Sequence, residues 1–399
     1  MNNLESYEEI VGKEVIDRIK EKTKKFHKKR IACISSTNKG GGVAEILNSI
    51  VLLFNTIGIE FDWKIIQGNP DFFEVTKAIH NGLQGNGSYL SEDMKNNYLD
   101  INERFALSNH LDHDLVIVHD PQPLPLINFY KKNQPWIWRC HIDISDPNPE
   151  TWDFLKQYIE KYDRMIISTE QYRKNLEIKQ NIISPAIDPL SPKNVPLSES
   201  AIDTILSNIG IDLKRPFIAQ VSRYDKWKDP LGVISVYEKV KKEFDCDLVL
   251  LGNIVTDDPE GVRVYDDIIK RYSHRRDIHL LINVADNDRV VNAVQSRARV
   301  IIQKSIKEGF GLIVAEAMYK GTPIVASSVG GIPLQIIDGE NGFLHNPRDE
   351  EGFKTSIVKI MKDTEMRARL GKNAHQYIVK SFLITRLMED WLDIFGEYL

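Results

Sequence analysis

Short runs of apolar residues recur along the first half of the chain, each separated from the next by a segment long enough for a helix. These runs lie at 30–36, 62–68, 114–120, 136–142 and 164–168. Apolar runs that alternate with helical segments are typical of a parallel sheet with helices on both faces. The first half is therefore predicted to be an α/β domain, preceded by a helical segment over 4–29 with apolar residues at helical spacing.

The same pattern restarts in the second half. Its apolar runs lie at 215–222, 246–252, 277–283, 299–303 and 322–328. A proline-rich polar stretch at 184–200 separates the halves and indicates a linker. The pattern predicts two Rossmann-like domains, 1–190 and 191–382, that face a central cleft. The amphipathic segment 383–399 is expected to form a terminal helix that completes the first domain.

Composition and charge narrow the functional classes. The 399 residues suit two domains of ordinary size. The 52 lysines and arginines against 57 aspartates and glutamates give a net charge of −5, so nothing attracts the whole chain to nucleic acid or an anionic membrane. The N-terminus has no signal-peptide pattern, and no apolar run reaches the length of about 20 residues that spans a bilayer. We expect a cytoplasmic protein with small-molecule partners; a homodimer is left open.

No metal site is predicted. The cysteines are far apart and form no Cys-x-x-Cys pair, which predicts reduced, buried thiols: Cys33, Cys140 and Cys246. His110 and His113 lack further ligands nearby and are expected in a surface turn. Asp245 and Asp247 imitate an Asp-x-Asp metal motif, but they precede a strand in a turn where polar residues are common. No cofactor is expected to be required, and an effect of Mg²⁺ is left open.

The first candidate binding motif is a run of glycines after the first apolar run. Gly40, Gly41 and Gly42 precede the apolar helical segment 43–58. Glycine lets backbone amides approach a ligand, and a helix N-terminus favours an anion, so the motif suits a phosphate or a sugar oxygen. It is neither Gly-x-Gly-x-x-Gly nor a Walker sequence, which counts against an NAD-dependent oxidoreductase and an ATPase.

The second motif is the segment 222–229, SRYDKWKD, which follows the first strand of the second domain. Open α/β sheets bind ligands at the carboxyl ends of their strands. Arg223 and Lys228 lie there and are cationic near neutral pH, so they suit a diphosphate. A solvated basic loop is the alternative.

The third motif, 304–318, is the most specific signal in the chain. It reads KSIKEGFGLIVAEAM, with glycines at 309 and 311 where backbone amides can be presented, and a helix is expected to begin at about Leu312. Glu308 precedes this turn and Glu316 lies inside the helix, so the two carboxylates can bind different parts of one ligand. A carboxylate is also the usual acceptor for ribose hydroxyls in nucleotide-binding folds.

Together these motifs resemble the retaining GT-B glycosyltransferases of the glycogen synthase and sucrose synthase clan. The resemblance implies that Arg223 and Lys228 hold the donor diphosphate and that Glu316 holds the ribose. It assigns the transferred sugar to Glu308 and to the turn that follows. The remaining donor-binding residues that it implies are Gly41, Gly42, Gly309, Phe310, Gly311 and Leu312.

Further segments resemble the trehalose glycosyltransferring synthases of archaea and thermophilic bacteria. They are STNKGGGVAEIL (36–47), TKAIHNGLQGN (76–86), VHDPQP (118–123), WIWRCHID (136–143), EKYDR (160–164), SRYDKWKDP (222–230) and DDPEG (257–261). This resemblance implies that Asp120 and His141 contact the glucosyl and acceptor hydroxyls. It implies reversible, metal-independent transfer of glucose from ADP-glucose or UDP-glucose to free glucose, giving α,α-trehalose. Lys304 departs from the wider clan, and the sequence offers no reason for it.

Other functions share much of this motif set. A trehalose phosphorylase would use inorganic phosphate instead of a nucleotide, and a related GT-B enzyme would use another acceptor, such as glucose 6-phosphate. A catalytically silent nucleotide-sugar sensor is a third alternative. The complete set of Arg223, Lys228, Glu308 and Glu316 weighs against the sensor. The nucleotide base stays open.

Overall fold

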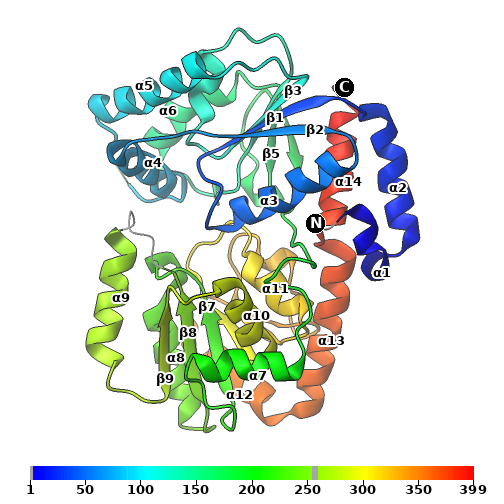
Figure 1. Cartoon of the computed structure of the whole chain (residues 1–399). Helices are drawn as coiled ribbons and strands as arrows, with labels where there is room; N and C mark the ends of the chain where they lie inside the picture. The colour runs from blue at the N-terminus through cyan, green and yellow to red at the C-terminus, as the bar shows by residue number, and fades with distance from the viewer. Residues whose placement is uncertain (1–2, 88, 254–258) are drawn as a thin grey trace. The chain divides into compact units, whose positions relative to one another are not determined.

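A computed structural model of the chain describes residues 3–87, 89–253 and 259–399. The first residues of the DDPEG segment, 257–258, lie outside this described part. The chain forms two compact units (Figure 1). The first comprises Met1–Ala186 together with Ile384–Leu399, and the second comprises Ile187–Leu383. No helix in the described ranges combines the length and apolar character needed to cross a membrane.

The first unit contains a six-stranded parallel sheet with the order β2-β1-β3-β4-β5-β6. Its strands are β1 (Arg30–Ser35), β2 (Glu60–Ile65), β3 (Leu115–His119), β4 (Trp136–Arg139), β5 (Arg164–Ile167) and β6 (Lys179–Ile182). All of the strands expected in this half are present. Strand β6 was not predicted, because it lies at the sheet edge, where its sequence KQNI stays partly exposed and shows no apolar run.

Helices cover both faces of this sheet. The main ones are α2 (Lys13–Thr23), α3 (Gly42–Thr56), α4 (Pro70–Leu83), α5 (Glu92–Ser108), α6 (Pro149–Ile159) and α14 (Ile384–Phe395). Short helical segments accompany them: η1 (Leu4–Tyr7), α1 (Glu8–Val11), η2 (Lys24–Phe26), η3 (Leu124–Asn128) and η4 (Glu170–Tyr172). The expected helical segment 4–29 is interrupted at Gly12, whose φ of 84° is accessible mainly to glycine.

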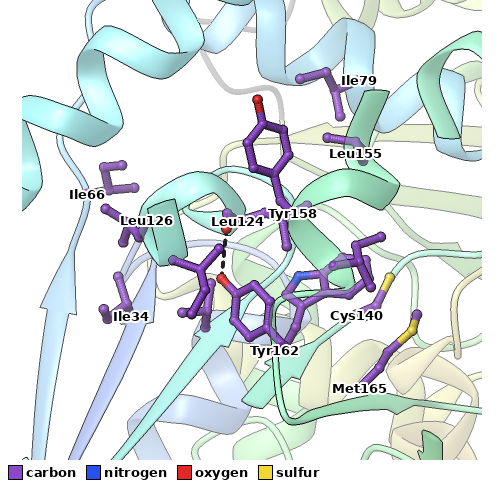
Figure 2. Packing of buried hydrophobic residues seen from close by; sticks show 14 of the residues in the cluster. Ile34, Ile66, Ile79, Leu124, Leu126, Cys140, Leu155, Tyr158, Tyr162 and Met165 are labelled. Carbon is purple, nitrogen blue, oxygen red and sulfur yellow. Dashed lines mark hydrogen bonds between the residues drawn. The ribbon is translucent and has the colours of Figure 1, made fainter. Parts of the chain in front are cut away.

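Alternate side chains of the strands form two separate apolar layers. One layer packs against α4, α5 and α6, and Figure 2 shows part of it, with the Tyr162 hydroxyl donating to the carbonyl of Leu124 at 2.7 Å. In the other layer, Phe395 of α14 contacts the rings of Phe26, Phe54 and Phe61. The last helix therefore supplies core residues to the unit that contains the N-terminus.

The second unit contains another six-stranded parallel sheet, with the order β12-β11-β10-β7-β8-β9. Its strands are β7 (Phe217–Val221), β8 (Asp247–Gly252), β9 (Ile278–Ile282), β10 (Val300–Gln303), β11 (Ile324–Ser327) and β12 (Phe343–His345). The sequence predicted all of these except β12, a short edge strand. Its helical segments are α7 (Glu199–Asn208), η5 (Lys226–Lys228), α8 (Pro230–Lys241), α9 (Pro259–Tyr272), α10 (Asn287–Arg297), α11 (Leu312–Tyr319), η6 (Ile332–Leu334), α12 (Glu350–Lys362) and α13 (Thr364–Ser381).

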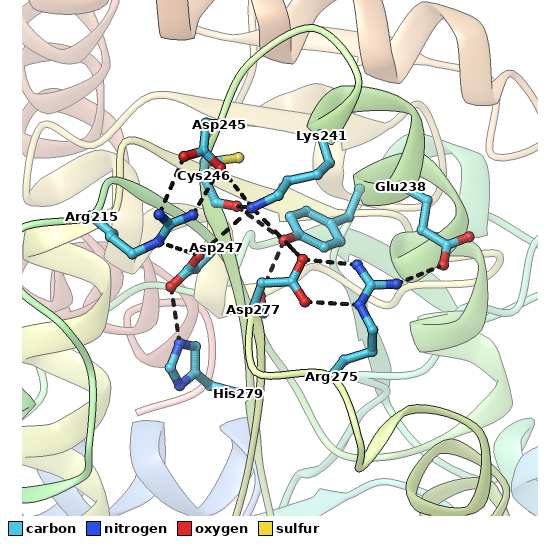
Figure 3. Close-up of polar contacts among 10 residues, drawn as sticks. Arg215, Glu238, Lys241, Asp245, Cys246, Asp247, Arg275, Asp277 and His279 are labelled. Carbon is cyan, nitrogen blue, oxygen red and sulfur yellow. Dashed lines mark hydrogen bonds and ion pairs between the residues drawn. The ribbon is translucent and has the colours of Figure 1, made fainter.

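A network of ion pairs lies at the amino ends of β7, β8 and β9 (Figure 3). Arg215 donates to Asp245 at 2.8 Å and to Asp247 at 2.9 Å, and Lys241 lies 2.8 Å from Asp245. Both carboxylates of the Asp-x-Asp sequence are therefore engaged by cations, at the end of the sheet opposite to the one where α/β folds bind ligands. Within the described ranges, no group of His, Cys, Asp and Glu side chains has an arrangement suited to a metal ion.

The expectation for His113 was wrong. Its side chain is buried and lies 3.3 Å from a carboxylate oxygen of Asp62 on β2, so it is not in a surface turn. The polar sequence around it resembles a turn and gives no sign that the side chain is buried. All three cysteines are unpaired and buried, as predicted.

The C-terminal residues also provide a counter-ion for a buried arginine of the first sheet. The guanidinium of Arg164, 2% exposed, pairs with Glu397 and lies 4.9 Å from the ring centre of Tyr398. We expect Glu397→Gln to lower the free energy of unfolding by about 1–3 kcal/mol, because it leaves a buried cation without its carboxylate. Urea unfolding monitors the effect. Glu389→Gln, which breaks the exposed pair with Arg18, should cost less than about 1 kcal/mol. Equal losses in the two variants would contradict this prediction.

Candidate functional site

The order of the second sheet identifies where a ligand would bind. Chain order reverses between β7 and β10, which are neighbours although three connections separate them in sequence. Ligands of open α/β sheets bind outside the carboxyl ends of strands at such a reversal. The segments that follow β7 and β10 are the two most informative motifs, 222–229 and 304–311. The structure therefore brings these two segments together at the carboxyl ends of two adjacent strands, β7 and β10.

A direct ion pair joins these two segments. Lys228 Nζ lies 2.5 Å from Glu308 Oε2, and both side chains are largely buried. The same oxygen accepts hydrogen bonds from Gln303 and from Ser305, each at 3.2 Å. The cation and carboxylate that the sequence assigned to one ligand are thus in contact, and sequence reasoning did not identify Gln303 and Ser305 as partners.

Arg223 occupies a more open position at the same carboxyl end of the sheet. Its side chain is 46% exposed, and its closest carboxylate is that of Asp225, at 3.4 Å. Asp225 is buried and accepts a hydrogen bond from the backbone amide of Trp227 at 2.7 Å, which fixes the loop. The arginine is therefore loosely held by a rigid loop and is accessible to an anion.

The glycine turn after Glu308 is supported from behind. Helix α11 begins at Leu312, as predicted, and Gly311 precedes it with a φ of 83°. Buried Gln335 donates to the carbonyl of Phe310 at 2.6 Å. A Cβ atom added to Gly331 would lie 2.8 Å from Phe310 Cα, so only glycine allows this approach. The glycine pair at 330–331 was the available sequence signal for this support, and it was overlooked.

Glu316 is less accessible than its expected role suggests. It is 2% exposed on α11, and Gln295 donates to its carboxylate at 3.4 Å. Lys320 donates to the backbone carbonyl of Glu316 at 3.2 Å, and burial lowers the pKa of this lysine to about 8. The carboxylate thus belongs to a buried polar group below the glycine turn.

The first sheet has its own order reversal, between β1 and β3. The glycine run follows β1, and Asp120 follows β3, so both lie at the position where this class of sheet binds ligands. Gly40 and Gly41 have φ values of 71° and 79°, and a Cβ at either would meet nothing within 4 Å. His141 follows β4, the strand beside β3.

Asp120 and His141 are tied to each other. A carboxylate oxygen of Asp120 accepts a hydrogen bond from the backbone amide of His141 at 2.7 Å. Asp120 has a φ of 62°, a left-handed conformation that is uncommon outside glycine and is often found at functional sites. Burial raises the pKa of its carboxyl group to about 6, against the opposing effects of the His141 amide and Arg139.

A second histidine orients His141. The Nδ1 atom of His119 lies 3.0 Å from Nε2 of His141, and the rings are stacked with centres 5.3 Å apart. The other nitrogen of His119 lies 3.1 Å from Cys33 Sγ. Burial lowers the pKa of His119 to about 3 and that of His141 well below its usual value, so both rings are neutral near pH 7. Sequence reasoning missed this chain of contacts, because Cys33 and His119 lie on different strands.

Arg139 is an unusual buried cation on the same face of the sheet. One nitrogen donates to Ser168 Oγ at 3.2 Å, while Nη1 has no hydrogen-bond partner in the described part of the chain. Burial lowers the pKa of its guanidinium to about 10. Arg139, His119 and His141 line a small cavity together with residues of α3, α14 and the first three strands and with Pro185. The positive charge beside the histidines also keeps them neutral.

Comparisons with known proteins cover both units of the chain. Residues 33–174 match the family described as trehalose synthase, N-terminal domain, and residues 201–377 match glycosyl transferases group 1. The chain is 45% identical to the trehalose synthase of Thermococcus litoralis, over 99% of this chain and 97% of that protein. It is 25% identical to the trehalose phosphorylase of Pleurotus pulmonarius, over 95% of this chain and 58% of that protein.

The fold has a close structural counterpart. Sucrose-phosphate synthase from Thermosynechococcus elongatus superposes with a TM-score of 0.71 and 16% identity, over 93% of this chain and 99% of that one. The two parallel six-stranded sheets show the GT-B fold, and the match to glycosyl transferases group 1 identifies the chain as a glycosyltransferase. Within that class, the chain belongs to the trehalose synthase family.

Proposed function

We propose that the protein is a retaining glucosyltransferase that makes α,α-trehalose from a nucleoside diphosphate glucose and free glucose. The observation that carries this proposal is the meeting of Arg223, Lys228 and Glu308 at the order reversal of the second sheet. Two cations, a carboxylate and a glycine turn at one end of the sheet are the groups that would bind a sugar diphosphate. Membership of the trehalose synthase family supports the choice of sugar and acceptor.

The second unit would bind the donor. Arg223 and Lys228 would bind the diphosphate, and the amides of Gly309–Gly311 with Glu308 would bind the transferred glucose. Lys228 would then exchange or share its contact with Glu308 for a phosphate oxygen. Glu316 would serve the ribose, and its low exposure means that a small movement of α11 or of Gln295 must accompany that contact.

The first unit would bind the sugars through Asp120, His141 and the glycine run. His119 occupies Nε2 of His141 and sets the orientation of the ring, so Nδ1 is the nitrogen that would bind a sugar hydroxyl. The carboxylate of Asp120 would accept a sugar hydroxyl. Gly41 and Gly42 would present backbone amides of α3 to an oxygen of the donor.

Charge separation would be the main barrier to the reaction. The bond between C1 of glucose and the diphosphate breaks while the anomeric oxygen of the acceptor bonds to C1 from the same face. The acceptor proton passes to the departing phosphate oxygen, so no protein nucleophile is needed. Arg223 and Lys228 would stabilise the charge that grows on the diphosphate, an effect worth several kcal/mol for preorganised groups.

Purified protein tests this function directly. Without added metal, the protein is incubated with glucose and either ADP-glucose or UDP-glucose, and proton NMR identifies the disaccharide. We expect α,α-trehalose with release of the nucleoside diphosphate, and the faster donor identifies the base. The reverse reaction uses trehalose with ADP, UDP or phosphate. If glucose 1-phosphate is the only product, the protein is a phosphorylase and not a synthase. If ADP, UDP and phosphate all give no product, both functions are refuted.

The raised pKa of Asp120 predicts a pH dependence. If the carboxylate accepts a sugar hydroxyl, kcat/KM should fall as the pH drops through about 6. Asp120→Asn keeps an oxygen for the His141 amide but should be slower and should lack this acid limb. An unchanged acid limb in Asp120→Asn would exclude Asp120 as its source.

The carboxyl group of Asp120 should also make stability depend on pH, but in the opposite direction: activity rises with pH, whereas stability falls. Between its ordinary pKa of about 4 in the unfolded chain and about 6 in the folded protein, the folded state binds the proton more tightly. The contribution of Asp120 to the free energy of unfolding therefore decreases as the pH rises through that range. Urea unfolding at several pH values, compared between the protein and Asp120→Asn, measures this contribution separately from catalysis.

A further inference from the structure

Lys304 is a buried lysine that the proposed donor chemistry does not use. It follows β10 directly, and its side chain is 4% exposed. Its ammonium group pairs with Asp229, which is the carboxylate within ion-pair distance of it among the described residues. A buried charge is costly unless a partner compensates it, so this pair must persist in the folded protein. Asp229 belongs to the segment that follows β7, and Lys304 belongs to the segment that follows β10.

Asp229 is the residue that ends the cationic loop and begins the next helix. Its φ of 48° is left-handed, and one carboxylate oxygen accepts the amide of Gly232 at 3.1 Å, which caps α8. The other carboxylate oxygen binds Lys304. A Cβ on Gly232 would lie 2.1 Å from that oxygen and 2.6 Å from Lys304 Nζ, so the glycine leaves the space that the pair occupies.

Asp229 directly follows Lys228 in sequence. Its pair with Lys304 is one of several contacts that join the segments 222–229 and 304–311. The amide of Ile306 donates to the carbonyl of Trp227 at 2.7 Å, which joins the two segments. Gln220 of β7 donates to the carbonyl of Lys228 at 2.8 Å, which holds the loop to its own strand. Lys304 adds a charged tie one residue beyond Lys228. The backbone on both sides of Lys228 is therefore held against the segment that carries Glu308.

We propose that Lys304 is a positioning residue for the donor site: through Asp229 it fixes the backbone that directs Lys228 toward Glu308 and the donor diphosphate. This inference rests on the proposed function, because it assumes that Lys228 binds the diphosphate. It gives a reason for a buried lysine at this position. A charge buried here gives the loop one defined conformation rather than adding a ligand contact.

The test compares nucleoside diphosphate binding with stability in three variants. Lys304→Met removes the ammonium and leaves Asp229 unpaired. The double variant Lys304→Met with Asp229→Asn leaves no unpaired buried charge, and asparagine still caps the helix and tolerates a positive φ. Lys354→Met is the control, since it breaks another lysine–carboxylate pair of the same unit, with Glu243 at 2.9 Å, away from the site.

Calorimetric titration with ADP and with UDP, kcat and donor KM, and thermal unfolding are the readouts. We expect Lys304→Met to lose both stability and binding, with kcat/KM reduced on the order of 10²-fold. The double variant should recover most of the stability while binding and kcat stay low, and Lys354→Met should bind normally. Recovery of binding and kcat together with stability in the double variant would overturn the inference, leaving the pair a role in folding only.

The two proposals fail in different ways. If the unmodified protein binds neither ADP nor UDP, the proposed donor site is wrong and the role of Lys304 in it falls too. If the protein binds one of them and Lys304→Met binds it equally well with unchanged kcat, the donor site stands and the role of Lys304 is refuted.

Discussion

Arg223→Ala is expected to lower kcat/KM by roughly 10²–10³-fold, the loss that follows when a preorganised group that stabilises transition-state charge is removed. The side chain is 46% exposed and its only close carboxylate, Asp225, lies at 3.4 Å in the described structure. Asp225 is buried but keeps its hydrogen bond from the Trp227 amide, and the half-exposed arginine holds it loosely, so losing the pair should cost about 1 kcal/mol or less. Activity should therefore fall while thermal unfolding stays nearly unchanged.

Arg289→Ala is the matched control for this experiment. Arg289 is 49% exposed on α10 of the same unit, and its pair with Asp286 is similarly loose, at 3.7 Å. Its removal should change neither kcat/KM nor stability measurably. Steady-state rates with the preferred donor, measured beside unfolding curves, compare the two variants. Near-normal turnover of Arg223→Ala would remove this arginine from the diphosphate site.

Gly331→Ala is expected to impair the donor site although it replaces no residue that is assigned to a ligand. The added Cβ would lie 2.8 Å from Phe310 Cα and 2.9 Å from the carbonyl oxygen of Gly309, and backbone atoms cannot move aside cheaply. The glycine turn must shift, and a displacement of about 1 Å at a reacting group can cost on the order of 10²-fold in rate. Overpacking should also cost about 1–3 kcal/mol of stability.

Gly339→Ala separates these two effects. Gly339 has a φ of 76°, so alanine strains its backbone, but the new Cβ would meet no atom within 4 Å. We expect a loss of about 1 kcal/mol in stability and normal kcat. Donor KM and kcat are measured for both variants at a temperature where both are folded. Equal activity of the two would show that the turn tolerates the displacement.

The central strands of both sheets were predictable because they are buried on both faces and read as continuous apolar runs. The edge strands β6 and β12 were not, since they have only four and three residues; the longer edge strands β2 and β9 were predicted. The motif residues Arg223, Lys228 and Glu308 could be named because their residue types fit one ligand chemistry. The contact of Lys228 with Glu308 at 2.5 Å could not be predicted, because it depends on the order of the strands in the sheet, which no local pattern contains.

The supporting residues were hidden for the same reason. His119 reads as one more residue of an apolar strand until Cys33 and His141 lie on either side of it. Lys304 had no explanation until Asp229, 75 positions earlier, proved to be its partner. The sequence therefore indicates groups whose chemistry suits a ligand more readily than groups that orient them, because orientation depends on contacts between distant segments.

The discontinuity of the first unit affects how the chain folds during synthesis. Helix α14, which covers Phe26 and Phe54, is translated after the whole of residues 187–383. At about 5–20 residues per second, a ribosome needs roughly 10–40 s to make that intervening stretch. During that time the apolar surface of the first unit lacks its last cover, while the second unit can already complete its sheet. On the ribosome, the later unit should therefore mature first.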